Sequence, residues 1–482
     1  MIARRSYGGP RTIAAAGAAL AALGAPAMTA QAQPSGDTAI STQVSVAYTV
    51  TDLGTFGGEL SNAHGINDLG EVVGVAETPT TAIKGFLWRD GELIDLGGLS
   101  ETGTGTQAYE VNDRSEVVGY SLAPDPEFSA RTAMPFYWSA DTGMVNLGHD
   151  LTHSGRGDGR DINNAGKVVG TWRSHPFTWT AAGGYSEMSL IPGAFFDQAE
   201  ALAVNESGVS VGFGSNPEAW TRPVRWQPDG NAEELPVLED GRYGRANDIN
   251  AAGMMVGEAD KAAGGFVPKP VIWHQDGSIE EIPLIPADPP LNMGMAEGVA
   301  DDGTSIGWDM SADFGDGRQV GWIRTPEGTK TALNDLIDLS TGWDIRIPLD
   351  INSSGQIVGI GIMTRDGVTY PGRAFLMTPL PVAGTASVRW HQGSYYGDLA
   401  WEGPSGGQVE VYRDDQLVAT TDNDGSHTDP IGNLRMGTVV TYRLCITRGD
   451  VCSADLAVEL GHRGRRQPAT SGLTVTFLGG RR

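Results

Sequence analysis

The segment Ala63-His64-Gly65-Ile66-Asn67, followed by Gly70 and then by Val72-Val73-Gly74, decides the fold because the chain repeats its pattern seven times. The shared pattern is Ala-x-x-Ile-Asn, two or three polar residues, Gly, and then x-Val-Val-Gly. Its anchor position, Asn in six of the seven units, recurs every 42 to 52 residues. The anchors are Asn67, Asn112, Asn163, Asn205, Asn250, Ala300 and Asn352. A period of this length with strand patterning predicts propeller blades or a linear array.

Two further runs follow the paired valines in the units. A third run ends on Trp in five units, as in Phe86-Leu87-Trp88, and a fourth ends on Asp-Leu-Gly or a relative, as in Asp95-Leu96-Gly97. Together with the two runs on either side of the Asn-containing turn, they make four short strands per unit. Four strands are the content of one β-propeller blade.

The chemistry of the repeated turn has a physical reason. An Asn side chain at a strand end can bond its own backbone two residues further on, and Gly adopts the left-handed conformation that closes the hairpin. The sixth unit has Ala300 in the Asn place, and we expect Asp301 to substitute for it. A second Gly, such as Gly74, is present in all seven units and indicates a bulge or a close approach of two backbones.

The ends of the repeat distinguish a closed ring from an open array. The seventh unit has a third strand at Ala374-Phe375-Leu376-Met377, but prolines follow and no fourth strand is evident. A matching strand, Tyr48-Thr49-Val50-Thr51-Asp52-Leu53-Gly54, precedes the first unit. Placed beside the last unit, it closes the ring and leaves only short, protected sheet edges. We therefore predict an all-β chain with a seven-bladed β-propeller over residues 48–380.

The repeat resembles a known family in several motifs. Residues 52–58 (Asp-Leu-Gly-Thr-Phe-Gly-Gly), Ile66-Asn67, Val72-Val73-Gly74 and Gly85-Phe86-Leu87-Trp88 are similar to the bacterial extracellular HAF repeat. The resemblance covers nearly the whole predicted propeller and is most specific in its first three units. It departs at the His-Ala-Phe that names the family, where the first unit has Lys84-Gly85-Phe86. The resemblance implies a secreted repeat protein and transfers no catalytic residue.

The beginning of the chain predicts export. A positively charged start is followed by an apolar, Ala-rich run and by the small-x-small cleavage site Ala30-Gln31-Ala32. We interpret residues 1–32 as a signal peptide and residues 33–47 as a linker. No later stretch approaches the ~18 apolar residues of a membrane span. We therefore expect a secreted bacterial protein, periplasmic or extracellular, without a membrane span.

The charge balance restricts the partners. The formal net charge is −26, from 33 Lys and Arg against 59 Asp and Glu. Such a surface repels phosphate groups, so we exclude nucleic acid as a partner. The charge also argues against a polyanionic ligand, unless the binding face is locally basic.

The pattern changes after the repeats. Alternating runs from about residue 385 to 460 are typical of a small β-sandwich. The runs Leu399-Ala400-Trp401, Val409 to Arg413 and Val440 to Cys445 resemble a fibronectin type III module. We predict such a module at residues 385–460.

The only two cysteines belong to this second domain. Cys445 and Cys452 are seven residues apart and fit a disulfide across its last hairpin, because the export signal predicts an oxidising compartment. The tail that follows, residues 461–482, is rich in arginine and is interpreted as a basic end of the chain.

Function should concentrate where the repeat units differ. The connections between first and second strands and between third and fourth strands are short and repetitive, whereas the other two connections are long and variable. Both variable connections emerge on one face beside the central channel, and loop variation on a rigid scaffold is where binding residues gather. The position three residues before the anchor also varies. Its residues are His64, Tyr109, Arg160, Leu202, Asn247, Glu297 and Leu349.

The ionisable residues of this face are compatible with one enzymatic activity. An Arg can neutralise a uronate carboxylate while His or Tyr removes and returns a proton, which is the chemistry of a polysaccharide lyase on acidic glycans. For any single residue, the simpler interpretation is a solvated loop side chain that bonds the backbone. The candidates are His153 or His64 as base, Tyr243 or Tyr109 as acid, and Arg160 or Arg245 on the carboxylate.

No nucleophile elbow, phosphate loop or zinc-protease signature occurs in the sequence, so we expect neither a metal nor a cofactor. The leading hypothesis is a secreted binding or scaffold protein for extracellular or cell-envelope glycans or proteins, and the lyase is the alternative. The sequence leaves open which ligand is bound, whether the chain is catalytic and what its oligomeric state is.

Overall fold

The described part of the chain is all-β, as the sequence predicts. It contains two short 3-10 helices, η1 (Leu333–Leu336) and η2 (Leu339–Thr341), among strands. The predicted signal peptide, linker and basic tail lie outside the described residues. The computed structural model describes residues 48–100, 103–124, 131–148, 155–194, 198–217, 219, 221–261, 267–288, 290–311, 319–380, 385–401, 408–422, 425–446, 453 and 456–460.

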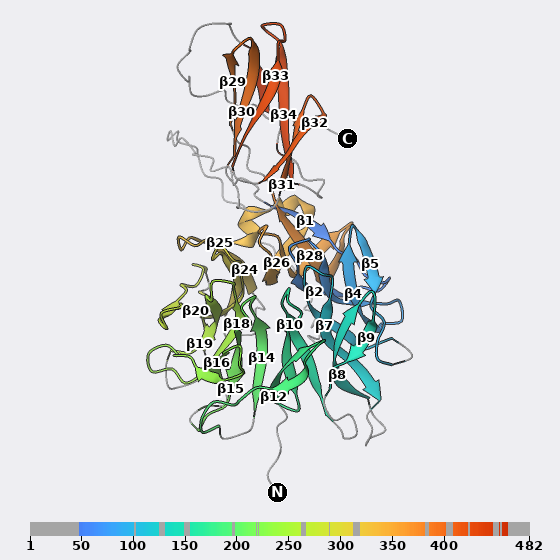
Figure 1. The fold of residues 1–482 in the computed structure, drawn as a ribbon, viewed down its shortest axis with the longest axis vertical. Coiled ribbons are helices and arrows are strands. Elements are labelled where there is room, and N and C mark those ends of the chain that lie inside the picture. Colours follow the sequence, from blue (N-terminus) through green and yellow to red (C-terminus); the bar gives the residue numbers. More distant parts are fainter. Residues whose placement is uncertain are drawn as a thin grey trace, which may run out of the picture. The chain divides into compact units, whose positions relative to one another are not determined.

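Within residues 48–379 the described strands form seven four-stranded antiparallel sheets, one for each repeat unit (Figure 1). The first four sheets are β2 (Ser61–Ile66), β3 (Val72–Glu77), β4 (Ile83–Arg89) and β5 (Glu92–Asp95); β6 (Thr106–Val111), β7 (Val117–Pro124), β8 (Arg131–Ser139) and β9 (Gly143–Asn146); β10 (Gly157–Ile162), β11 (Val168–Trp172), β12 (His175–Thr180) and β13 (Gly184–Glu187); and β14 (Ala199–Val204), β15 (Ser210–Gly214), β16 (Arg222–Trp226) and β17 (Ala232–Glu234). The last three are β18 (Gly244–Ile249), β19 (Met255–Ala259), β20 (Lys269–Trp273) and β21 (Ile279–Glu281); β22 (Met293–Val299), β23 (Ser305–Met310), β24 (Gln319–Arg324) and β25 (Lys330–Ala332); and β26 (Trp343–Ile351), β27 (Ile357–Arg365), β28 (Val368–Pro379) and β1 (Tyr48–Asp52).

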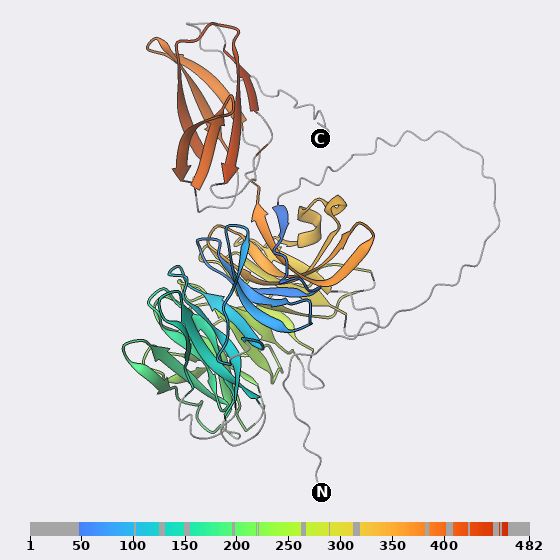
Figure 2. The same ribbon diagram turned by 90° about the vertical axis from the view of Figure 1, so that its right-hand side faces the viewer.

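The seven sheets follow one another around a ring. Each sheet packs against the next in chain order, and the seventh packs against the first. The succession is visible in Figure 2 as the change of colour from blue through green to orange. The first strands of neighbouring sheets lie next to each other all the way round. We call these strands, β2, β6, β10, β14, β18, β22 and β26, the inner wall.

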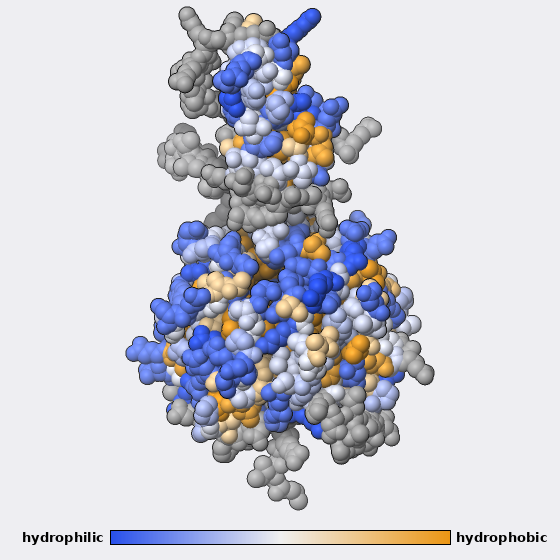
Figure 3. Space-filling view, in the orientation of Figure 1, coloured by the Kyte–Doolittle hydropathy of each residue, from blue (hydrophilic) through white to orange (hydrophobic). Residues whose placement is uncertain are grey.

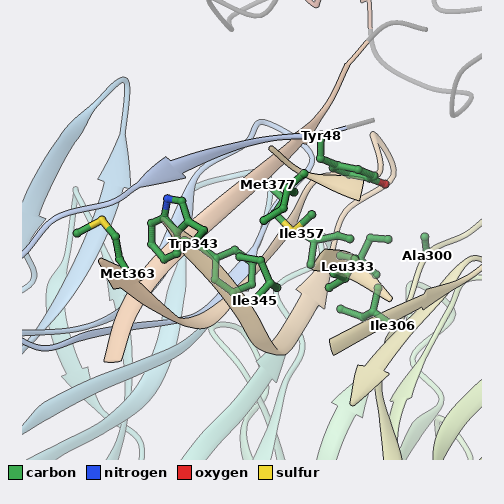
Figure 4. Packing of buried hydrophobic residues seen from close by; sticks show 12 residues of the cluster. Tyr48, Ala300, Ile306, Leu333, Trp343, Ile345, Ile357, Met363 and Met377 are labelled. Carbon is green, nitrogen blue, oxygen red and sulfur yellow. The ribbon is translucent and has the colours of Figure 1, made fainter. Parts of the chain in front are cut away.

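The N-terminal strand completes the seventh sheet, as the sequence predicts. β1 pairs antiparallel with β28, with Tyr48 opposite Pro379 and Asp52 opposite Phe375. The Asp52 carboxylate accepts two bonds from Nη2 of Arg373, at 2.9 and 2.8 Å. Tyr48 lies in a buried cluster between the sixth and seventh sheets, together with the residues shown in Figure 4.

The turn asparagines connect the sheets. The Nδ2 of Asn67 donates to the main-chain oxygen of Asn112 at 2.9 Å, and equivalent bonds continue from sheet to sheet as far as Ala300. The Nδ2 of Asn352 donates to the oxygen of Asn67 at 3.0 Å and joins the last sheet to the first. Each Asn thus serves its own turn and the neighbouring one, so we call this set of bonds the asparagine ladder.

The sixth turn departs from this pattern and corrects one expectation. Ala300 has no side-chain amide to donate, so the ladder lacks the link from the sixth sheet to the seventh. Asp302, rather than Asp301, replaces the missing acceptor, since its Oδ1 accepts from the amide of Thr304 at 2.7 Å. Asp301 instead accepts from the amide of Ala251 in the preceding sheet at 2.8 Å.

We expect Ala300→Asn to stabilise the protein by about 1 kcal/mol, because it supplies the missing ladder bond. Asn352→Ala should destabilise it by about 1–3 kcal/mol, because buried main-chain groups of two sheets lose their partner. Midpoints of urea unfolding measure both effects, with Asn231→Ala in an exposed turn as the control. An unchanged midpoint for Asn352→Ala would show that the ladder does not hold the ring.

Every first strand of a sheet carries a β-bulge at the same place. In the first sheet the register with β3 skips His64, between Ala63 and Gly65. In all seven sheets the skipped residue is the variable one three positions before the anchor. The bulge therefore leaves this residue without a partner in the strand pairing. Opposite the bulge, a Cβ on Gly74 would lie 2.0 Å from the oxygen of Asn62, which confirms the close backbone approach predicted for the second Gly.

Residues 385–459 contain two further antiparallel sheets around one hydrophobic core, to which Tyr395 and Leu399 of one sheet and Val411 and Tyr442 of the other contribute. Cys445 is buried, whereas Cys452 lies outside the described residues, so their disulfide stays a prediction. The sheets are β29 (Thr385–His391), β30 (Ser394–Ala400) and β33 (Ser426–Gly432); and β32 (Gln416–Asp422), β31 (Gln408–Arg413), β34 (Val439–Ile446) and β35 (Leu456–Glu459).

The surface seen in Figure 3 is mainly hydrophilic, with small hydrophobic areas scattered over it. In the described part of the chain, no helix has the length and apolar character that crossing a membrane requires.

Candidate functional site

The bulged residues of the first three sheets form a contiguous cluster on the inner wall. The rings of His64 and Tyr109 are 5.4 Å apart between centroids. The Arg160 guanidinium carbon lies 4.7 Å from the centroid of the Tyr109 ring. Because equivalent positions of successive sheets face each other around the ring, three residues that are far apart in sequence come into contact. We call these three residues the bulge cluster.

The hydrogen bonding of His64 defines its tautomer. Its Nδ1 lies 2.7 Å from the main-chain oxygen of Ala108, which can only accept, so Nδ1 carries the proton. Burial lowers the pKa of His64, and the bond to Ala108 opposes this shift only in part. The imidazole is therefore neutral at physiological pH and its Nε2 is an acceptor.

Arg160 is already paired with acidic residues. Its Nη2 is 3.1 Å from Asp158 and 3.9 Å from Glu200. Burial lowers the pKa of Arg160, but Asp158, Tyr109 and Glu200 together outweigh this effect and raise it, so Arg160 stays charged. Asp158 and Glu200 therefore compensate much of the positive charge of Arg160 that would be needed to bind the carboxylate of a uronate.

The acid–base capacity of Tyr109 is reduced by its surroundings. Burial raises the pKa of the Tyr109 hydroxyl, and the charge of Arg160 offsets only part of the shift. Its Oη lies 3.5 Å from Oε1 of Gln107, at the limit of a hydrogen bond. At neutral pH, Tyr109 can act as a hydrogen-bond donor or stacking surface more readily than as a phenolate.

The inner wall of the fifth and sixth sheets continues this polar region. The Nε of Arg245 donates to Oδ1 of Asn247 at 2.8 Å, and Asn247 donates to the oxygen of Ala296 at 2.9 Å. Burial raises the pKa of Glu258 to about 7, although Arg245 opposes the shift. Burial also raises the pKa of Glu297, which accepts a bond from Nε1 of Trp308 at 2.8 Å.

The predicted site residues thus fall into three groups. His64, Tyr109 and Arg160 are brought into contact, and Arg245 joins them through its electrostatic interaction with Glu200. For Tyr243 the structure gives a main-chain contact, in which its amide donates to Oδ1 of Asp260 at 2.8 Å. His153 lies outside the described residues, so its assignment as base stays a prediction.

The charges of this region give no local basic excess. Within the described residues, the groups linked by these electrostatic interactions are four carboxyls and three guanidiniums. The carboxyls are those of Asp158, Glu200, Glu258 and Glu297, and the guanidiniums are those of Arg156, Arg160 and Arg245. A locally basic face, which a polyanionic ligand would require, is therefore not present there.

Sequence reasoning missed a set of partly buried acids two positions before the anchors, which we call the acid ring: Glu110, Asp161, Asp248 and Asp350. Oδ2 of Asp161 accepts from the amide of Val204 in the next sheet at 2.6 Å. Asp248 and Asp350 make the same bond to their next sheets, at 2.8 and 2.7 Å. These three acids therefore tie adjacent first strands together.

A signal for the acid ring was present in the repeat. Where Asp161, Asp248 or Asp350 reaches across, the equivalent position of the receiving sheet is small: Ala203, Gly298 or Gly65. Acidic residues in one unit followed by Gly or Ala in the next thus indicate a side chain that crosses between units. Among the described residues, no group of three or more His, Cys, Asp or Glu side chains is arranged to hold a metal ion.

Comparisons with known proteins add the following findings. No family model matches the chain, and no curated protein matches it. Among solved structures, a gluconolactonase from Xanthomonas campestris is similar at 10% identity and a TM-score of 0.33, over 71% of this chain and 93% of that one. The extracellular domain of a one-component system from B. thetaiotaomicron is similar at 8% identity and a TM-score of 0.43, over 83% of this chain and 51% of that one.

A third similar structure is Porphyromonas gingivalis dipeptidyl peptidase 4, at 10% identity and a TM-score of 0.29, over 72% of this chain and 66% of that one. None of these TM-scores reaches 0.5, so none of these structures supports an activity for this chain.

Proposed function

We propose that the chain is a secreted binding protein: a seven-bladed β-propeller over residues 48–380, followed by a fibronectin type III-like module over residues 385–460. The ligand, an extracellular or cell-envelope glycan or protein, binds at the inner wall and the adjoining variable loops. One observation carries this proposal. Positions that repeat in every unit build the ring, whereas the bulged position has no partner in the strand pairing and differs from unit to unit. In the first three units it holds His64, Tyr109 and Arg160, which are in contact.

A second candidate, a lyase on acidic glycans, rests on the contact between His64, Tyr109 and Arg160. Neutral His64 with a free acceptor on Nε2 is suited to removing a proton. Arg160, however, is engaged by Asp158 and Glu200, and the region as a whole has no basic excess to attract a uronate. The binding function is therefore the better supported of the two.

The test is binding and turnover by the same preparation of the exported chain, which begins after residue 32. We expect a ligand from a glycan array or from a panel of cell-envelope proteins to bind without being converted. His64→Ala and Tyr109→Ala should each weaken its binding about tenfold, equivalent to about 1.4 kcal/mol.

The control is His274→Ala, which removes a histidine paired with Glu280 at 3.2 Å, away from the bulge cluster. Absorbance of an unsaturated product on uronate polymers, lost in His64→Ala, would replace the binding function by the lyase. Equal losses of affinity in all three variants would remove the inner wall as the binding site.

A further inference from the structure

Next to the bulge, residues that pair between the first and second strands of a sheet carry polar atoms without hydrogen-bond partners. In the third sheet Asp158 pairs directly with Thr171, and in the fifth sheet Arg245 pairs with Glu258. Oδ1 of Asp158, Oγ1 of Thr171 and Oε2 of Glu258 are buried and make no hydrogen bond within the described chain. Thr171 is 7% exposed and Glu258 is 6% exposed. Groups so deeply buried are normally satisfied by protein, by ordered water or by a ligand, so these atoms are available to hydrogen-bond a bound ligand.

Aromatic residues occupy the same register position in the sheets between and beside these two. Tyr120 pairs with Gln107 in the second sheet, Phe213 with Glu200 in the fourth, and Trp308 with Met295 in the sixth. All three rings are partly exposed. From the second to the sixth sheet the second strand therefore alternates aromatic, polar, aromatic, polar, aromatic, and we call this row of residues the inner tier.

The unpartnered atoms define the chemistry of the missing partner. Both carboxylate oxygens require a donor, Nε of Arg160, which also lacks a hydrogen-bond partner, requires an acceptor, and the Thr171 hydroxyl can donate or accept. An anionic ligand would lie beside Asp158 and Glu258, whose oxygens would repel it. A cationic ligand would compete with Arg160 and Arg245, which already neutralise the same carboxylates. Hydroxyl groups on a neutral ligand satisfy the oxygens without either conflict.

We propose that the inner tier binds a neutral, polyhydroxylated ligand, such as an uncharged sugar residue of a glycan. Its hydroxyls bond Asp158 Oδ1, Glu258 Oε2 and Thr171 Oγ1, and its carbon–hydrogen faces pack on the rings of the tier. The raised pKa of Glu258 agrees with a site that carries little net charge. This inference rests on the proposed binding function and specifies its ligand class.

The probes are matched sugars that differ in one substituent: oligosaccharides of glucose, galactose and mannose, the corresponding uronates, and the corresponding 2-amino sugars. Titration calorimetry on the full exported chain measures their affinities. We expect at least one neutral oligosaccharide to bind at least tenfold more tightly than its uronate and its amino counterpart. Tightest binding of an anionic or a cationic member would overturn the proposal.

Two nearly isosteric variants locate the site. Thr171→Val removes an unpartnered buried hydroxyl, so the free protein should melt at the same or a higher temperature while affinity falls about tenfold. Glu258→Gln should also weaken binding about tenfold. The control, Glu233→Gln, alters an exposed residue of the edge strand β17 that pairs with Arg225. If Thr171 or Glu258 had a merely structural role, its variant would not lose affinity for the sugar while the stability of the free protein was retained.

Separate results distinguish this proposal from the function on which it rests. If a neutral sugar binds but Thr171→Val and Glu258→Gln leave its affinity unchanged, the inner tier is not the site and the binding function stands. If no sugar of any charge binds, the saccharide proposal is wrong, and only capture of a cell-envelope protein would then support the binding function.

Discussion

A chain that begins at residue 60 should be far less stable than one that begins at residue 40, because it lacks β1. The buried side chains of Tyr48 and Leu53 would be removed, each contributing about 1.5–3 kcal/mol. Arg373, only 8% exposed, would lose Asp52 and become an unpaired buried charge, at a cost of about 3–5 kcal/mol. The combined loss is on the order of the total stability of a typical domain.

Thermal unfolding of the two chains measures this effect, and a peptide sharpens it. A synthetic peptide of residues 46–60 added to the shortened chain should restore most of the lost melting temperature by pairing with β28. The same peptide with Tyr48→Ser and Leu53→Ser should restore much less. Equal melting temperatures of the two chains would mean that the ring does not depend on its N-terminal strand.

Stability should fall as the pH rises from about 4 to 8, because of the acid ring. Burial, the largest cause, and neighbouring carboxylates raise the pKa of Asp161 from 3.8 to about 8 and that of Asp350 to about 7. Burial raises the pKa of Asp248 to about 6 and that of Glu110 well above its ordinary value. The charged groups that act on these four are other acids, namely Asp68, Asp301 and the members of the acid ring themselves.

The sign follows from proton binding. Between the unfolded and folded pKa values the folded protein holds more protons than the unfolded chain, so raising the pH favours unfolding. One pKa unit corresponds to about 1.4 kcal/mol, so the group as a whole should change the free energy of unfolding by several kcal/mol. Glu258, with its pKa raised to about 7, adds an effect of the same sign.

Melting temperatures recorded from pH 4 to pH 8 test this expectation. We expect a decrease of at least about 5 °C for the unmodified chain and a flatter profile for Asp161→Asn, whatever the stability of that variant at pH 4. Asp141→Asn, in an exposed turn, should follow the unmodified chain. The scan ends at pH 8 because Lys330, whose pKa burial lowers to about 8, has the opposite effect at higher pH. A melting temperature that rises with pH would show that the acid ring is ionised at little cost.

Much of the fold could be predicted from local features of the sequence. The anchor Asn with its following Gly specifies a turn through short-range bonds, such as those from the amides of Leu69 and Glu71 to Oδ1 of Asn67. The strand before the first unit lacks a partner within its own unit, and β28 lacks a fourth strand, so their pairing could be inferred. The second Gly indicated the close approach that excludes a Cβ at Gly74.

The candidate site was predictable only in part. The position of His64, Tyr109 and Arg160 varies between units, which drew attention to these residues. The reason for this variation is a bulge that leaves them out of the strand pairing, and it is visible only in the pairing register. Sequence reasoning also could not tell that Asp302, and not Asp301, accepts the turn hydrogen bond in the sixth unit. Either carboxylate is near enough in sequence, and the backbone geometry of the turn decides between them.

The sequence by itself thus determined the repeat, the four strands of each unit and the closing strand, because these depend on hydrogen bonds and patterns within one unit or at its two ends. Tertiary structure alone decided which side chains of different units meet, since contacts such as Arg160 on Tyr109 arise only when neighbouring sheets pack in the ring. It also decided the charge states, because the desolvation that raises the pKa of Asp161 depends on burial by sheets that are distant in sequence.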